Sequence, residues 1–386
     1  MSIQIKEVIT KQDLKAFVCF PLELYKDCKY FVPPIINQEM LALNREKNPS
    51  FEVCDTKLWL AYIDGKIVGR IAGIIHKPFV EKWGNRYARF GWLDFIDSEK
   101  VATTLLATAE NWASDNGMEA IHGPLGFTDF DPEGILIEGF SELSTIIERY
   151  NYPYYANYIE KNGYHKDADW VEYEIDIPKK LPEKFLKVSD FVQRKNNLKI
   201  ARLKTLRDIL PYVDEIFSII NDIYGLMYGF TPVSEIQTKF YIQRYLKLVN
   251  PEFVSIVLDK NNKVVAFGVC LPSYSKALQK AKGKMFPFGF YHMYKALKKN
   301  DVIDMYFVGI RPDFQNKGVL AVMFNDLANK IIAKGYLKAE TNVEFESNEK
   351  MQNLWSYFER RQHKRRRSYF KYLDSKPRGE DDAMIR

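Results

Sequence analysis

Hydrophobic and polar positions follow the same pattern twice along the chain. A short alternating segment begins at Ile3 in "IQIKEVITKQDLKAFVCF", and another begins at Ile200 in "IARLKTLRDILPYVDEIF". In both places a helical spacing of apolar residues follows the alternation. Each copy therefore predicts a strand followed by an amphipathic helix.

A second element repeats farther along each copy. "IDGKIVGRIAGII" and "KNNKVVAFGVCL" each read as a turn that leads into an apolar strand, with Asp64-Gly65 and Asn261-Asn262 as the turn pairs. Lys66 and Lys263 are separated by the same number of residues as the two strand starts. Two elements repeated at one offset indicate a duplicated domain.

The duplication predicts a mixed α/β or α+β protein with two domains. Prolines and lysines interrupt the periodicity in "IPKKLPEKF", which is typical of a boundary. We expect an N-terminal domain at 1–178, a linker at 179–197 and a C-terminal domain at 198–386. The second copy also carries an insertion at 272–302, expected to be a helical hairpin over a cleft or a lid that admits a lipid tail.

A strand, a polar loop and a helix follow one another in "YFVGIRPDFQNKGVLAVMF". The unpaired amides of a helix start, together with a loop of bare backbone, form a cradle for an anion. Gly318 permits close approach, while Lys317 and Arg311 add positive charge. The first copy lacks this loop, because Asp97-Ser98-Glu99 starts its helix directly. We expect a pyrophosphate site in the second copy alone.

This segment resembles the GNAT superfamily of acyl-CoA-dependent N-acyltransferases. Gln315 and Gly318 stand at the first two fixed positions of that family's pyrophosphate loop, whereas the third position holds Leu320 instead of Gly or Ala. The resemblance implies two tandem domains, each with a mixed, mostly antiparallel sheet flanked by helices, and a coenzyme A thioester (acyl-CoA or acetyl-CoA) as co-substrate without a metal. The cofactor-binding residues that it implies are Val308, Ile310, Gln315, Asn316, Lys317, Gly318, Val319, Leu320 and Asn348.

Three further segments, 122–140, 150–166 and 282–289, resemble the tandem-GNAT group that includes the bacterial ceramide synthases. This resemblance implies an N-acyltransferase that moves a long acyl chain to the amine of a sphingoid base. It also implies a cytoplasmic protein that is soluble or in peripheral contact with the inner membrane.

Carboxylates supply candidates for the general base. Glu340, Glu344 and Glu346 alternate within "LKAETNVEFESN", so one strand would place them on the same side. In a partly dry cleft such a carboxylate acquires a raised pKa and accepts a proton from an ammonium group; a solvated strand edge is the alternative. The resemblance implies a tyrosine as general acid about seven residues after Asn348. Trp355 stands there, and we expect Tyr357 to take the role.

The loop "GFTDFDPEG" holds Asp129, Asp131 and Glu133. These residues suit a turn, and together with the neighbouring phenylalanines they also suit a cationic amine with an apolar tail. No histidine stands at ligand spacing, so we expect no metal. His292 is an alternative base, and His122 is the other histidine near the expected cleft.

Charge and composition narrow the choice of partners. The net charge is +6, and much of it comes from "RRQHKRRR" at 360–367, which predicts a solvated face or a flexible tail. Such a run attracts phosphate-bearing ligands, anionic lipids or nucleic acid, but neither zinc-finger spacing nor an RNA-stacking signature accompanies it, so we expect no nucleic acid partner. The four cysteines fit reduced thiols.

No apolar run reaches the ~20 residues that span a bilayer, and the charged N-terminus does not resemble a signal peptide. Three alternatives to long-chain transfer stay open: an N-acetyltransferase acting on a small or protein amine, a non-catalytic acyl-CoA or lipid-binding protein, and a nucleic-acid binder that uses the basic run.

Overall fold

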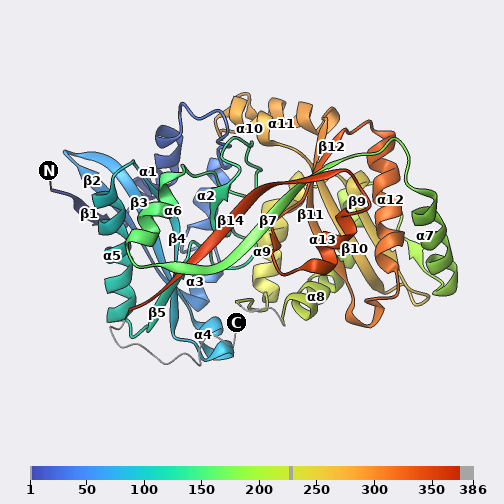
Figure 1. The fold of residues 1–386 in the computed structure, drawn as a ribbon, viewed down its shortest axis with the longest axis horizontal. Helices are drawn as coiled ribbons and strands as arrows, with labels where there is room; N and C mark the ends of the chain where they lie inside the picture. The colour runs from blue at the N-terminus through green and yellow to red at the C-terminus, as the bar shows by residue number, and fades with distance from the viewer. Residues whose placement is uncertain (1, 226–228, 374–386) are drawn as a thin grey trace.

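The computed structural model describes residues 2–225 and 229–373. Its strands form one sheet in the order β1-β2-β3-β4-β5-β14-β7-β12-β11-β10-β9-β8, with β6 beside β14 and β13 beside β7. Figure 1 shows this sheet running through the whole molecule, with helices on both faces. The α+β class and the mixed, mostly antiparallel sheets expected from the sequence are therefore confirmed.

The first half contains the following elements: β1 (Gln4–Glu7), α1 (Lys11–Leu24), α2 (Ile36–Ala42), α3 (Ser50–Val53), β2 (Cys54–Ile63), β3 (Lys66–His76), α4 (Lys77–Trp83), β4 (Tyr87–Phe95), α5 (Glu99–Asp115), β5 (Ala120–Gly123), β6 (Ile135–Glu138), α6 (Tyr154–Lys161) and β7 (His165–Asp176).

The second half contains α7 (Glu183–Lys195), β8 (Lys199–Ile200), α8 (Val213–Tyr224), α9 (Glu235–Tyr245), β9 (Val254–Leu258), β10 (Val264–Pro272), α10 (Ser275–Ala281), α11 (Gly289–Lys298), β11 (Val302–Ile310), α12 (Val319–Ala333), β12 (Lys338–Glu340), β13 (Glu344–Phe345), α13 (Glu349–Trp355) and β14 (Arg360–Tyr372).

The two halves repeat one topology, and the expected hairpins are present. Asp64, Gly65 and Asn262 adopt positive φ angles in the turns of β2–β3 and β9–β10, as tight hairpin turns require. In each half one pair of strands is parallel, β4 with β5 and β11 with β12. The insertion forms α10 and α11. Among the described residues, no helix is both long and apolar enough to cross a membrane.

The last strand of each half is exchanged across the centre of the sheet. β14 pairs with β5 of the first half, while β7 pairs with β12 and β13 of the second half, and β7 and β14 pair with each other. Figure 1 shows these two long strands crossing the middle of the molecule together. Neither half of the sheet is therefore complete without a strand from the other.

Helix α7 occupies most of the stretch expected as a linker. It packs against α12, and Val192 belongs to the apolar core beneath that helix. The division into 1–178, 179–197 and 198–386 stays a prediction, and the exchanged strands interlock the two parts.

The basic run at 360–367 lies within β14, so the expectation of a flexible tail is wrong, and a solvated face is found only at 360–362. Lys364 and Arg366 are each 1% exposed. Burial opposes the ionisation of Glu172 on β7, but Lys364 and Arg366 outweigh it and lower the pKa of this carboxyl to about 2. The Arg366 Nε–Glu172 Oε1 distance is 2.7 Å.

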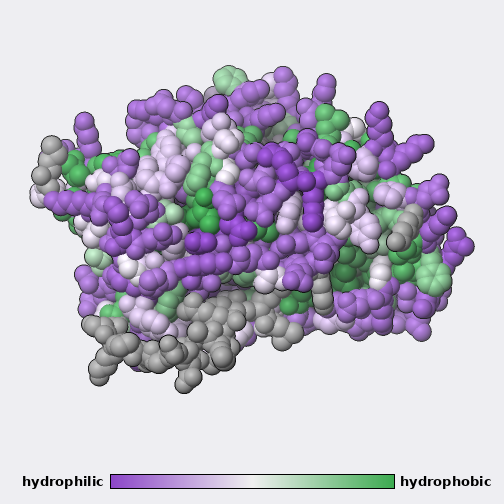
Figure 2. All heavy atoms as spheres, viewed as in Figure 1, coloured by the Kyte–Doolittle hydropathy of each residue, from purple (hydrophilic) through white to green (hydrophobic). Residues whose placement is uncertain are grey.

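Three arginines of β14 that reach the surface are also paired, whereas Arg360 donates to the carbonyl of Gln352. Arg361 contacts Glu142 and Glu174, and Arg365 and Arg367 share Asp169. Figure 2 shows hydrophilic side chains across the middle of this face, where β7 and β14 cross. Carboxylates of both halves thus neutralise the run, which weakens the hypothesis of nucleic-acid binding.

Arg366→Ala should lower the free energy of unfolding by about 3–5 kcal/mol, because it leaves the buried carboxylate of Glu172 without one of its two cations. Urea denaturation followed by tryptophan fluorescence measures the change. Arg361→Ala, on the same strand but exposed, is the control and should cost at most about 1 kcal/mol. Equal losses in both variants would contradict a buried ionic centre.

Candidate active site

A cavity forms where β11 and β12 separate. The two strands pair only from Val302 to Asp304, opposite Lys338 to Glu340. Beyond that point β11 continues along β10. The segment that follows β12 instead stays with β7 and pairs with it as β13. One edge of β11 is thereby left without a strand partner, although Asn342 Nδ2 donates to the carbonyl of Tyr306 at 3.2 Å.

The cavity measures about 210 Å³ and receives residues from both halves of the chain. Its walls are mainly apolar and aromatic, with Phe130, Trp170, Ile220, Tyr224, Phe230, Tyr306, Phe307, Val308, Met323 and Phe324 among the lining residues. Its polar side chains include Arg89, His122, Asp129, Glu133, Asp167, Glu344 and Asn348. A long apolar ligand with one polar reacting group suits such a lining.

The loop after β11 has the backbone expected of an anion cradle. Asn316 and Gly318 adopt φ angles of 60° and 76°, and Gly318 starts α12. Their amides make no hydrogen bond to other described residues, whereas the amide of Ala321, in the first turn of α12, donates to the carbonyl of Gly318 at 3.0 Å. A Cβ atom at Gly318 would lie 2.9 Å from Val192 Cγ2 on α7, so a larger residue here would have to displace that side chain.

Arg311 and Lys317 were both expected to offer positive charge to a phosphate, but Arg311 is already paired. Arg311 is committed to Asp313 and Asp259, so it offers little charge to a phosphate. Lys317 is exposed and lies over the ring of Phe314. Gln315 Nε2 donates to the carbonyl of Ile310 at 3.4 Å, which connects the loop to the end of β11.

The expected strand at 337–348 is broken, and its three carboxylates do not share one side. The break coincides with the departure of the chain from β11 toward β7. Glu340 joins the ionic cluster through Lys364, and Glu346 pairs with Lys166 and Arg365. Only Glu344 lines the cavity.

Glu344 has the environment of a general base. Burial raises the pKa of its carboxyl to about 7, and a hydrogen bond from Trp355 Nε1, 2.8 Å from Glu344 Oε1, partly offsets the rise. Its other oxygen has no hydrogen-bond partner among the described residues. A carboxylate that is half ionised near neutral pH exchanges protons readily with a substrate.

Two of the expected site residues, Asn348 and Tyr357, lie at opposite ends of helix α13, and only Asn348 lines the cavity. Asn348 caps it by accepting from the amide of Met351 at 3.4 Å, and it also lines the cavity. Tyr357 follows the helix and is 61% exposed; it is absent from the cavity wall. The structure instead places Trp355 beside Glu344, a pair that the sequence signals only through the substitution of the family's tyrosine by tryptophan.

The acidic loop of the first half contributes two carboxyl groups to the same cavity. Asp131 accepts the amide of Phe127 at 3.0 Å and pairs with Arg244, so it shapes the loop. Asp129 and Glu133, two residues to either side, line the cavity and share a hydrogen bond. Burial, reinforced by the neighbouring Asp129, raises the pKa of Glu133 well above its usual range.

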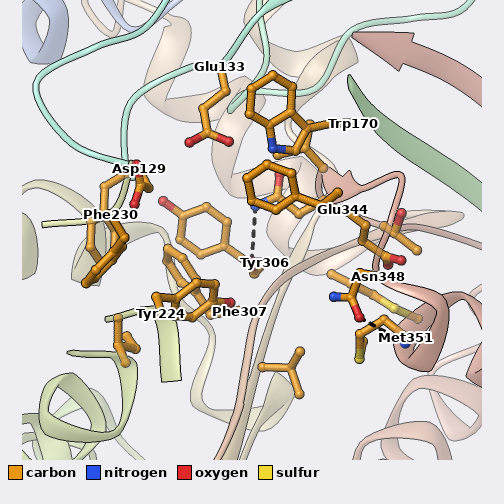
Figure 3. A pocket seen from close by; sticks show the side chains of 18 of the residues that line it. Asp129, Glu133, Trp170, Tyr224, Phe230, Tyr306, Phe307, Glu344, Asn348 and Met351 are labelled. Atoms are coloured by element: carbon orange, nitrogen blue, oxygen red, sulfur yellow. Dashed lines mark hydrogen bonds between the residues drawn. The ribbon is translucent and has the colours of Figure 1, made fainter. Parts of the chain in front are cut away.

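Figure 3 shows Asp129 and Glu133 on one side of the cavity and Glu344 with Asn348 on another, with Tyr306 between them. Desolvation raises the pKa of both carboxyls, and the neighbouring Asp129 raises that of Glu133 further, which favours a pair that shares one proton. Such a pair complements one ammonium group without the repulsion of two ionised carboxylates.

Of the two histidines considered, His122 lines the cavity and His292 lies on α11, outside it. The Nδ1 atom of His122 is 3.3 Å from Asp167 Oδ2. In the part of the chain described, one group of metal-ligand type is found, at Glu172, Glu340 and His363. The ammonium of Lys364 already contacts both of these carboxylates.

Known proteins resemble this chain along most of its length. No family model matches the chain. It is 28% identical to protein YghO of Escherichia coli K12 over 378 residues, which are 96% of this chain and 95% of YghO. It is 26% identical to the bacterial ceramide synthase of Caulobacter vibrioides over 359 residues, covering 90% of this chain and 91% of that protein.

The structure superimposes on a tandem GNAT protein from the clavulanic acid biosynthesis pathway with a TM-score of 0.57 at 9% identity, covering 97% of this chain and 100% of the other. The chain has a tandem GNAT fold. The resemblance expected from the sequence is thus confirmed, and the separation of β11 from β12 is the feature of this GNAT fold that forms the cavity.

Proposed function

We propose that this protein is an acyl-CoA-dependent N-acyltransferase that transfers a long acyl chain to the amine of a sphingoid base. The observation that carries the proposal is the open edge of β11, which runs from an apolar cavity with three carboxyl groups in its wall to a loop of free amides. The bacterial ceramide synthase, similar along nearly the whole chain, supports the choice of substrates.

The donor would lie along β11. The amides of Asn316, Gly318 and the start of α12 would hold its pyrophosphate, with Gln315, Lys317, Val319 and Leu320 around them. The backbone of β11, including Val308 and Ile310, would pair with the pantetheine arm like an added strand. Asn348 faces the same cavity and would contact the arm from the opposite wall.

The acceptor would enter from the side of the first half. Its ammonium group suits the single charge of the Asp129–Glu133 pair, and its apolar tail suits the aromatic walls formed by Phe130, Tyr224 and Phe230. Glu344 would take the proton from the amine. The nitrogen would then bond to the acyl carbon as the carbon–sulfur bond breaks, and the departing thiolate would take the second proton that the nitrogen gives up.

Thiol release from palmitoyl-CoA and acetyl-CoA tests the reaction. With a sphingoid base as acceptor, palmitoyl-CoA should release thiol and acetyl-CoA should release little, because only the long chain fills the apolar walls. Turnover of acetyl-CoA with small amines would instead identify an acetyltransferase. Calorimetric binding of CoA without turnover of any amine would indicate a binding protein.

Gly318→Asp should weaken CoA binding by at least about tenfold, because it places a carboxylate against the expected pyrophosphate. Isothermal titration calorimetry measures the affinity. Gly318→Asn is the matched control: it brings a side chain of the same size against Val192 at the same φ of 76°, without the charge. Equal affinity in the two variants would exclude this loop as the site.

Glu344→Gln should lower the acylation rate by roughly 10²-fold or more, the usual contribution of a general base, whereas Glu346→Gln should leave the rate unchanged. In the unmodified protein, activity should rise as the pH passes through about 7, where Glu344 loses its proton.

The variant Trp355→Phe tests whether Glu344 acts as the general base or has only a structural role. The hydrogen bond from Trp355 lowers the pKa of Glu344, so its loss should move the acidic limb of the pH–rate profile to higher pH. An unshifted profile, or full activity of Glu344→Gln, would assign the base elsewhere.

A further inference from the structure

The hairpin of α10 and α11 carries a concentration of exposed aromatic side chains. Five of the exposed large apolar residues of the described chain fall within nine positions. They are Phe286, Phe288, Phe290, Tyr291 and Tyr294. Isolated apolar residues on a surface are ordinary, but a contiguous group marks an interaction site.

The same hairpin is strongly basic. From 272 to 300 the sequence contains seven lysines and no acidic residue. The lysines are Lys276, Lys280, Lys282, Lys284, Lys295, Lys298 and Lys299, and all are exposed. Lysines elsewhere, such as Lys6 and Lys371, form ion pairs with carboxylates. None of these seven lysines has an ion pair with a described residue.

Aromatic and basic residues occupy one face of α11. Phe290, Tyr294 and Lys298 are exposed at successive turns, whereas Met293 is buried beneath them. Lys295 and Lys298 lie over the rings of Tyr291 and Tyr294. We name the five aromatic residues and seven lysines the aromatic–lysine patch. They lie on α10, on α11, in the segment between them and directly after α11. Both helices lie along the upper rim in Figure 1, where Figure 2 shows purple and green side chains together.

Hydrogen bonds and apolar contacts attach the hairpin to both halves of the protein. Gln279 on α10 donates to the carbonyls of Lys29 and Phe31 at 2.8 and 2.9 Å, and the amide of Ile36 donates to Gly283 at 3.0 Å. On the inner side, Leu278 and Met293 share an apolar core with Tyr306, which lines the active-site cavity. The hairpin therefore presents a fixed surface directly behind the wall of that cavity.

We propose that the aromatic–lysine patch docks the protein on an anionic lipid bilayer. Aromatic rings partition into the interfacial region of a bilayer, and lysines beside them pair with anionic head groups while their alkyl stems remain near the apolar phase. The absence of acidic residues from the segment removes the repulsion that such head groups would otherwise meet. This inference rests on the surface alone and does not depend on acyl transfer.

Vesicle flotation with the full chain tests the docking. The protein should float with vesicles of phosphatidylcholine and phosphatidylglycerol, and it should stay largely unbound with phosphatidylcholine alone. Added salt should weaken the binding, because screening reduces attraction between exposed charges. Equal partition onto both kinds of vesicle, or onto neither, would overturn the proposal.

Two variants assign the binding to the patch. Phe286→Ser with Phe288→Ser should lower vesicle affinity by at least about tenfold through lost apolar burial, and Lys280→Gln with Lys284→Gln should lower it by about as much. The matched controls are Ile9→Ser with Leu337→Ser, which are exposed apolar sites elsewhere, and Lys179→Gln with Lys180→Gln, which are exposed lysines elsewhere.

Both controls should float like the unmodified protein, and all variants should keep the unmodified circular dichroism spectrum. Loss of flotation in the controls to the same degree would show unspecific attraction. If the unmodified protein instead forms a dimer by light scattering that Phe286→Ser with Phe288→Ser dissociates, the patch is an interface between two copies and the bilayer proposal fails.

Discussion

The pairing of β7 with both β12 and β13 determines where the cavity forms. β11 and β12 begin as parallel neighbours, but after Asp304 the partner of β11 is drawn away to pair with Val171 and Trp170 on β7. Because β7 comes from the first half of the chain, the second half cannot open its own cleft alone. The same exchange brings the loop with Asp129 and Glu133 against that cleft.

The strand exchange buries charged side chains where β7 and β14 pair, and it also brings their counter-ions to the same place. Lys364 and Arg366 enter the centre of the sheet from the second half and meet Glu172 from the first. An isolated buried ion would cost several kcal/mol, so each strand depends on the other for its charge balance as well as for its hydrogen bonds. The two halves should accordingly fold together.

Local pattern in the sequence was sufficient for the repeated strands, the hairpin turns and the helix starts, since these depend on neighbours within a few residues. The basic run was misinterpreted because its partners, Glu172 and Asp169, lie about two hundred positions away. Glu340, Glu344 and Glu346 were expected on one strand. Pairing with β7, which is distant in the sequence, divides that stretch into β12 and β13 and sends the three side chains to different partners. Glu344 was a candidate from the sequence, but its pairing with Trp355 required the fold.

Duplication left the first half with a closed counterpart of the cleft. After β5 the chain stays beside β4, where the amide of Leu125 donates to the carbonyl of Phe90 at 2.8 Å. A Cβ atom at Gly91 would collide with the carbonyl of Leu125, and one at Gly123 with that of Phe90. The cavity that remains there measures only about 40 Å³, too little for a pantetheine arm, and helix α5 begins without the amide-rich loop that precedes α12. The first half thus keeps the GNAT scaffold, but its strands stay together and form no cleft. The loop after this closure carries Asp129 and Glu133, which line the cavity of the second half.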